Sequence, residues 1–124
     1  MTKEFILNTL IKYKEDRSKC ASLGKVSCVY LHLKTGNKCA VGEHLIDGEH
    51  QHFNGSVDRL FDKYGFGILT QEAQEQQIPV NVWMEMQRYH DSIAYYGSKS
   101  KELPHIVETL EFKTGFKFPE LLFN

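Results

Sequence analysis

Apolar residues recur at helical spacing in several stretches of the chain, most of them bounded by residues typical of helix ends. The first helix is predicted over 3–16, with Thr2 available as its N-cap. Its apolar stripe consists of Ile6, Leu7, Leu10 and Ile11. A second, short helix is predicted after Ser56 and ends at Gly65, because glycine readily adopts the left-handed conformation found at helix C-termini.

The polar stretch 70–77 (TQEAQEQQ) is helix-prone and must end at Pro79. Asn81 can then cap the helix with the strongest pattern in the chain, which Gly97 ends. Its apolar stripe consists of Val82, Trp83, Met86, Tyr89, His90 and Ile93.

A last helix is predicted from Pro104 to Gly115. Its inward-facing residues are Ile106, Val107 and Leu110. The apolar tail 116–124 (FKFPELLFN) is expected to dock on the body of the protein or on a partner.

Between the first two helices the pattern changes from helical spacing to alternation. The stretches 27–33 and 38–42 flank the turn-forming residues KTGN and predict a β-hairpin. A lone hairpin is marginally stable, so one of its faces must pack on the helices. The predicted fold is therefore α+β: a single domain over 1–124, mostly helical, with four to five helices and one small hairpin.

The register of this hairpin decides where Cys39 points. A three-residue loop over 35–37 places Leu33 opposite Cys39, whereas a two- or four-residue loop turns Cys39 toward His32. The first register separates two faces cleanly. The apolar face carries Val29, Leu31, Leu33, Cys39 and Val41, and the other carries Cys28, Tyr30, His32, Ala40 and Gly42. Burial favours this register, which makes Cys39 a core residue.

Composition narrows the classes of protein. The 124 residues fit one domain, and the formal charge of −1 gives no reason to expect nucleic acid or an anionic membrane as partner. Three irregularly spaced cysteines argue against a disulfide framework. The N-terminal stretch does not resemble a signal peptide, and no apolar run reaches the length of a membrane span. A cytoplasmic protein is expected.

Thiol chemistry is one candidate activity. Cys39 could act as nucleophile, His90 as base and Asp91 as the group that orients His90. However, adjacent helical residues point about 100° apart, which argues against Asp91 orienting the ring of His90. Buried cysteine is common, and a histidine on an apolar stripe is more often a hydrogen-bonded core residue. The sequence therefore favours a non-catalytic protein over a hydrolase that uses Cys39 and His90.

The loop 44–52 is the only candidate metal site. Its potential ligands are His44, Asp47, Glu49, His50 and His52. It lacks a helical H-x-x-x-H pair, and the chain has no C-x-x-C. A solvated loop is the favoured interpretation, and neither a metal nor a cofactor is expected.

Aromatic residues outside the apolar stripes are numerous near the C-terminus and would mark an interface where they are exposed. They are Tyr95, Tyr96, Phe112, Phe116, Phe118 and Phe123. A binding site is expected where the polar face of the hairpin and the strongest helix meet the loop 42–55 (GEHLIDGEHQHFNG), which contains three glycines. The candidate binding residues are Tyr30, His32, His44, Trp83, His90 and Asp91.

Two motifs carry a resemblance to known proteins. They are CVYL…GNKCAVGEHLID, over 28–47, and WMEMQRYHD, over 83–91. The chain resembles a loose family of small, uncharacterised proteins encoded by phages, prophages and plasmids, whose members show C-x-Y, then G-x-K-C-A-V-G, and later L-Q-x-x-H-D. This chain departs from the pattern at Met86, where leucine is usual, and in LIDGEHQHF, where a proline and a tyrosine are common.

The resemblance implies an accessory protein of a mobile element that acts in a bacterial cytoplasm. Such a protein is expected to bind and antagonise a host protein, for example a component of a defence system. A sequestering binder of a small nucleotide-like ligand and a homo-oligomer are the alternatives without catalysis.

Overall fold

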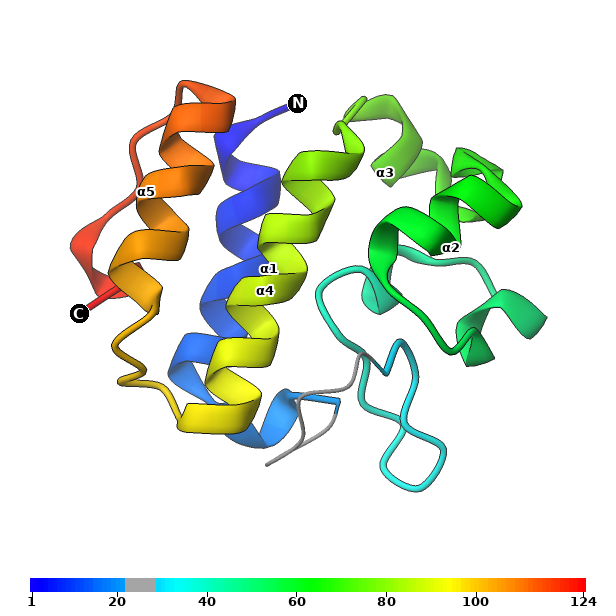
Figure 1. The fold of residues 1–124 in the computed structure, drawn as a ribbon, viewed down its shortest axis with the longest axis horizontal. Helices are drawn as coiled ribbons and strands as arrows, with labels where there is room; N and C mark the ends of the chain where they lie inside the picture. The colour runs from blue at the N-terminus through cyan, green and yellow to red at the C-terminus, as the bar shows by residue number, and fades with distance from the viewer. Residues whose placement is uncertain (22–28) are drawn as a thin grey trace.

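The computed structural model describes residues 1–21 and 29–124, and in them the protein is helical. Five α-helices are formed: α1 (Lys3–Glu15), α2 (Val57–Tyr64), α3 (Gln71–Glu75), α4 (Val80–Tyr96) and α5 (Leu103–Thr114). Helix α4 packs against α1, α2 and α5. Figure 1 shows α1 and α4 side by side, with α5 on one side of this pair and α2 and α3 on the other. No helix in the described part of the chain combines the length and apolar character that crossing a membrane requires.

The predicted helices are confirmed, with small changes at their ends. Thr2 caps α1 by accepting a hydrogen bond from the Phe5 N–H, and Gly115 ends α5 in the left-handed conformation. The expected Asn81 cap of α4 is wrong, because α4 already begins at Val80. The carbonyl of Pro79 accepts hydrogen bonds from the Val82 and Trp83 N–H groups, so Pro79 takes the capping position.

The predicted α+β fold is wrong, because the described residues contain no hairpin. Its expected strands 27–33 and 38–42 meet at a single antiparallel bridge, Leu31 to Lys38, and residues 27–28 lie outside the described residues. Past this bridge the chain leaves the extended conformation. The Glu43 N–H donates to the Cys39 carbonyl, and the 3₁₀ turn η2 (Gly42–His44) follows.

The segment 39–42 is fully buried, which explains why alternation was misleading. Cys39, Ala40, Val41 and Gly42 are all buried, whereas alternation predicts Ala40 and Gly42 on the polar face of the hairpin. Ala40 and Gly42 are small enough to lie in the core, and a side chain on Gly42 would collide with the Tyr30 carbonyl oxygen at 1.9 Å. A fully buried segment shows no period of two.

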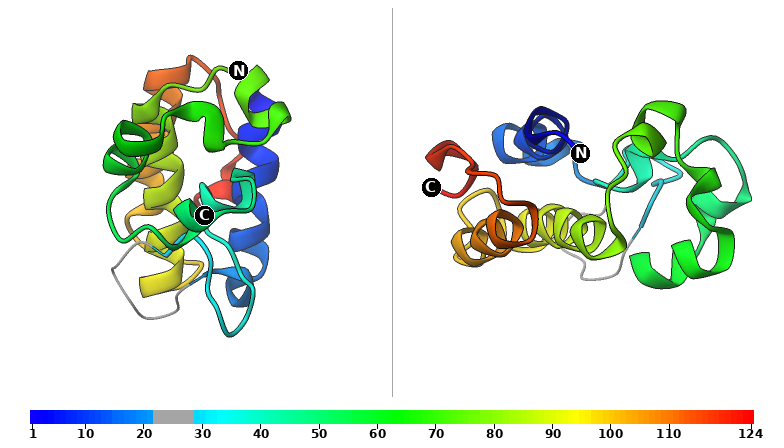
Figure 2. Two further views of the ribbon diagram at one scale, coloured as in Figure 1. Left: turned by 90° about the vertical axis from the view of Figure 1, so that its right-hand side faces the viewer. Right: turned by 90° about the horizontal axis from the view of Figure 1, so that it is seen from above.

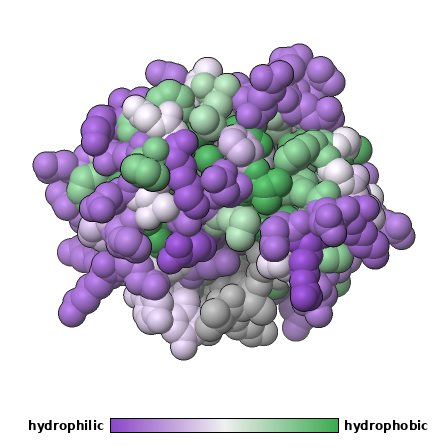
Figure 3. All heavy atoms as spheres, turned by 45° about the horizontal axis from the view of Figure 1, so that its top comes forward, coloured by the Kyte–Doolittle hydropathy of each residue, from purple (hydrophilic) through white to green (hydrophobic). Residues whose placement is uncertain are grey.

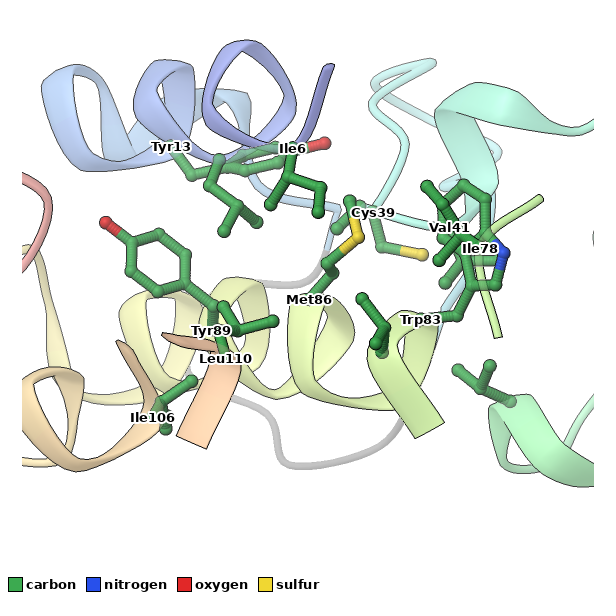
Figure 4. Close-up of a cluster of buried hydrophobic side chains, with 14 of the residues drawn as sticks. Ile6, Tyr13, Cys39, Val41, Ile78, Trp83, Met86, Tyr89, Ile106 and Leu110 are labelled. Carbon is green, nitrogen blue, oxygen red and sulfur yellow. The ribbon is translucent and has the colours of Figure 1, made fainter. Parts of the chain in front are cut away.

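The register prediction was therefore half right. Cys39 does point into the core, at 0% exposure, but Leu33 does not lie opposite it and is 79% exposed. Figure 4 shows Cys39 and Val41 between Ile6 of α1 and Met86 and Trp83 of α4. The predicted direction of the Cys28 side chain is not tested, because Cys28 lies outside the described residues.

The C-terminal tail docks on the protein. Leu122, in the 3₁₀ turn η5 (Glu120–Leu122), is buried, and its carbonyl accepts a hydrogen bond from the Tyr89 hydroxyl at 2.5 Å. The Lys14 Nζ donates to the Asn124 carbonyl at 2.6 Å. Figure 2 shows the tail returning past α5 toward α1. The tail therefore covers the α1–α4 pair on the α5 side, and α2 and α3 lie on the opposite side (Figure 1).

Candidate functional site

His44 lies at the end of η2, in the space between α1 and α4. The buried segment before it holds this turn against α1, so the imidazole packs on the Phe5 ring with centroids 4.6 Å apart. The Trp83 ring of α4 lies 5.6 Å from the imidazole and 6.3 Å from the Phe5 ring, so the three rings form one cluster. His44 is therefore held in place by aromatic side chains from two helices. The sequence-based prediction of a solvated loop is wrong for this residue.

The hydrogen bonds of Thr9 determine which nitrogen of His44 carries the proton. The Thr9 hydroxyl donates to the Phe5 carbonyl at 2.9 Å, so its oxygen must act as the acceptor toward His44 Nε2, also at 2.9 Å. In the neutral imidazole, Nδ1 is then an acceptor. No described residue donates a hydrogen bond to this Nδ1.

Glu43 connects His44 to two further side chains of α1. Its Oε1 lies 2.5 Å from the Lys12 Nζ and 3.3 Å from His44 Nε2. Its Oε2 accepts a hydrogen bond from the Tyr13 hydroxyl at 2.5 Å. Burial and the Glu43 carboxylate raise the pKa of Tyr13 well above its usual value, which keeps this hydroxyl protonated as a donor.

The charge state of His44 follows from the same surroundings. Burial and the neighbouring Lys12 ammonium lower its pKa to about 4. The ring is therefore neutral at neutral pH. It presents one acceptor nitrogen and no net charge.

These side chains line a polar cavity of about 320 Å³ between α1, η2 and α3, which we call the His44 pocket. Its lining residues are Thr2, Glu4, Phe5, Asn8, Thr9, Lys12, Glu43, His44, Glu72 and Gln76. Thr2 donates from both its N–H and its hydroxyl to Gln76 Oε1, which joins the start of α1 to the residue after α3. A cavity that contains a histidine with a shifted pKa and several convergent polar groups is the strongest candidate site in the described chain.

His90 and Asp91 lie elsewhere and serve the fold. The Ala21 N–H donates to His90 Nε2 at 3.1 Å, and His90 Nδ1 then donates to Asp91 Oδ1 at 2.8 Å. Gln87 Nε2 also donates to Asp91 Oδ1, and Gln87 Oε1 accepts from the buried Val41 N–H. We call these hydrogen-bonded groups of Ala21, Val41, Gln87, His90 and Asp91 the α4 network.

The α4 network corrects the expectation that Asp91 could not orient the ring of His90. The carboxylate reaches back along the helix surface to Nδ1 despite the angle between adjacent residues. It also removes His90 as a base for Cys39, since both ring nitrogens are used. Cys39 Sγ is itself an acceptor for the Gly42 N–H at 3.3 Å. The two catalytic candidates therefore do not form a thiol–imidazole pair in this structure.

Among the other predicted binding residues, Trp83 packs on His44 and His90 is bonded to Asp91, but none of them lines the His44 pocket. Tyr30 is buried and donates to the Gly55 carbonyl, whereas His32 lies in the turn after the Leu31 bridge and accepts from the Thr35 N–H. Trp83 is buried beside Ile78 and Val41 in the core (Figure 4), and its Nε1–H has no acceptor among the described residues. Of the six, only His44 lines the pocket.

The histidine-rich loop gives no metal site. His50 is buried with its Nε2 2.6 Å from the Ile46 carbonyl, whereas His52 is exposed. In residues 1–21 and 29–124, no three histidine, cysteine or acidic side chains are grouped closely enough to hold a metal ion.

Sequence reasoning missed Thr9, Lys12, Tyr13 and Glu43, although one signal was present. Phe5, Thr9 and Lys12 are spaced at i, i+4 and i+7, so one face of α1 carries an aromatic, a hydroxyl and an ammonium in line. This face is the wall of the His44 pocket. What the sequence could not show is that η2 packs against it.

Comparisons of the chain with family models, curated proteins and solved structures find no match. The resemblance to phage and plasmid proteins therefore stays a prediction.

Proposed function

We propose that the protein acts by binding, as an accessory protein of a phage or other mobile element that antagonises a host factor in the bacterial cytoplasm. The observation that carries the proposal is the His44 pocket. Its histidine is neutral and has one nitrogen already bonded to Thr9, and its other nitrogen is an acceptor that no described residue uses. Such a group is suited to receive a donor from another molecule.

The chemistry of His44 favours binding over catalysis. A general base works best when its pKa lies near the operating pH, and burial and Lys12 hold the pKa of His44 at about 4. A base with so low a pKa removes few protons at neutral pH. His44 is therefore better suited to hydrogen bonding with a bound molecule than to acting as a general base.

The exposed aromatic residues support a protein partner. Tyr95 and Tyr96 form an edge-to-face pair at the end of α4 and line a second cavity with Arg88. Tyrosine and arginine dominate binding energy at protein interfaces. Phe112 on α5 is 90% exposed, whereas Phe118 is buried in the docked tail. The predicted aromatic surplus is thus split between core and surface.

A protection assay tests the proposal. Bacteria that carry defence systems would express the wild-type protein or a variant, and phage plating or plasmid establishment would be counted. We expect the wild type to protect the phage or plasmid from the defence system. Glu72→Arg, which reverses one exposed charge of the pocket, should lose this protection. The matched control Glu108→Arg, on the exposed face of α5, should protect fully.

Cys39→Ala separates binding from thiol catalysis in the same assay. Alanine is small enough for the buried site, so the melting temperature should fall only modestly. A folded Cys39→Ala protein that protects as well as the wild type supports binding. If a folded Cys39→Ala protein gives no protection, or if wild type protects against none of the defence systems, the proposal is wrong.

A further inference from the structure

We infer that a second cavity, between the 3₁₀ turn η4 (Phe66–Ile68) and the junction of α3 with α4, binds a small uncharged molecule that has an apolar ring and one hydrogen-bonding group. We call it the α3–α4 cavity. The inference goes beyond the proposed function, because it concerns a small ligand at a site that shares no lining residue with the His44 pocket. It depends on the lining of the cavity, on its size and on the backbone conformation of Gln77.

The α3–α4 cavity is apolar at its base. Leu69, Ala73 and Ile78 line it and are at most 4% exposed, so its base is formed by core residues. Phe66 lines its wall and is 44% exposed. None of the described residues that line this cavity is charged. A charged ligand would lose hydration there without gaining a partner, so the lining selects an uncharged and largely apolar molecule.

The size of the cavity suits one small molecule. Its volume of about 350 Å³ lies near the lower end of the range for ligand cavities, which is roughly 300–1,000 Å³. Figure 3 views the molecule from the end where α3 and the start of α4 lie, and it shows apolar residues gathered between hydrophilic ones on this face. A protein partner would need a contact surface of about 800 Å² around the cavity, whereas a small molecule needs only the cavity itself. The confined apolar area therefore favours a free small ligand.

The backbone of Gln77 provides an independent observation. Its φ of +52° is the only positive φ at a non-glycine residue in the described chain. Glycine takes the positive φ at the ends of α2, α4 and α5, at Gly65, Gly97 and Gly115. A side chain in this conformation costs stability that glycine would avoid. The exception thus occurs at the one of these four positions that lines the α3–α4 cavity.

A bound ligand explains why a side chain is kept at this position. The carboxamide of Gln77 makes no hydrogen bond with another described residue, whereas the Gln74 carboxamide, also in the lining, donates to the Leu69 carbonyl. Strained residues are concentrated at ligand sites, where the strain is part of the function. A carboxamide offers both a donor and an acceptor. Gln77 is therefore the residue that bonds the polar group of the ligand.

Titration with three compounds that share one ring system tests the inference. Indole is uncharged, indole-3-acetate is anionic and tryptamine is cationic at pH 7. Each would be added to the full-length protein while the backbone amide resonances are recorded by NMR. We expect saturable shifts with indole at the amides of Leu69, Ala73 and Ile78, and about tenfold weaker binding of both charged compounds. No saturation by indole up to its solubility, or equally tight binding of a charged compound, would overturn the inference.

Gln77→Gly separates a role in binding from a purely structural role. Glycine adopts the positive φ without strain, so the melting temperature should not fall. Loss of the carboxamide removes one hydrogen bond to the ligand and should weaken indole binding about fivefold. A variant that is at least as stable as the wild type and binds indole more weakly supports the inference. Unchanged affinity for indole contradicts the role of Gln77.

Phe66→Ala tests whether indole occupies this cavity. The variant removes part of the apolar wall and should weaken indole binding about tenfold. The matched control is Phe112→Ala on α5, where the ring is 90% exposed, and it should bind as the wild type does. Equal binding by the two variants would place indole elsewhere and contradict the inference.

The source of the ring is read from N-acetyltryptophanamide, which carries indole on a peptide unit. Weaker binding of this compound than of indole supports a free small molecule. Tighter binding would assign the cavity to a side chain of a protein partner and overturn the inference. The titrations need no defence system, so their failure is distinguishable from failure of the proposed function.

Discussion

Two histidines, the buried His90 and the partly buried His44, show opposite uses of the same side chain. Each packs against an aromatic ring and lies within reach of the carboxylate of an adjacent residue: Asp91 for His90 and Glu43 for His44. Both nitrogens of His90 are bonded to the protein, whereas one nitrogen of His44 is an acceptor that no described residue uses. Burial and a neighbouring acid thus do not identify a functional histidine. The unused hydrogen-bonding capacity does.

The α4 network gives Gln87, His90 and Asp91 a common structural role. Gln87, His90 and Asp91 use the surface of α4 to hold the backbone at Ala21 and Val41, two points far apart in sequence. They fix the segment that ends in η2, and η2 presents Glu43 and His44 to α1. The geometry of the His44 pocket therefore depends on the α4 network. Damage to the network should disturb the pocket, but changes in the pocket should leave the network intact.

The largest effect is expected from Gly42→Ala. An added Cβ would lie 1.9 Å from the Tyr30 carbonyl oxygen, a backbone atom that cannot move away easily. We expect a loss of about 3 kcal/mol in the free energy of unfolding, measured by urea denaturation. The control is Gly67→Ala, where the added Cβ meets nothing within 4 Å. Equal stability of the two variants would show that the Tyr30 contact does not constrain this turn.

A smaller effect is expected from Gln87→Ala, which breaks the α4 network. The buried Val41 N–H would lose its acceptor, and an unsatisfied buried donor costs about 2 kcal/mol. Hydrogen exchange should also become faster at the Val41 amide. Gln71→Ala, at an exposed position of α3, is the matched control and should change stability by less than about 0.5 kcal/mol. If Val41 exchanges equally fast in both variants, the network does not hold this segment.

The helices could be predicted from the sequence, and the site could not. The stripes of α1 and α4 and the glycines that end α4 and α5 are local signals, and the structure confirms them. The segment 39–42 misled because its small residues are buried on every side. An alternating pattern predicts Ala40 and Gly42 on the exposed face of a strand. The meeting of Glu43 and His44 with Thr9 and Lys12 depends on packing between segments about 30 residues apart, which periodicity cannot show.

The smallest effect is a difference in acid sensitivity caused by His44. In the unfolded chain this imidazole has its ordinary pKa near 6.5, and in the folded protein burial and Lys12 lower it to about 4. Between these values the unfolded state binds a proton that the folded state does not, so the contribution of His44 to stability is present above pH 6.5 and is lost as the pH falls toward 4.

Comparison with His44→Gln isolates this contribution. On acidification from pH 7 to pH 5.5, most carboxylates stay ionised, and the wild type should lose about 1 kcal/mol more unfolding free energy than His44→Gln. His105→Gln, on the exposed face of α5, should behave as the wild type does. Urea denaturation of the three proteins at both pH values measures the difference. If wild type and His44→Gln lose the same amount, the folded protein does not lower the pKa of His44, and the ring is protonated within this pH range instead of staying neutral.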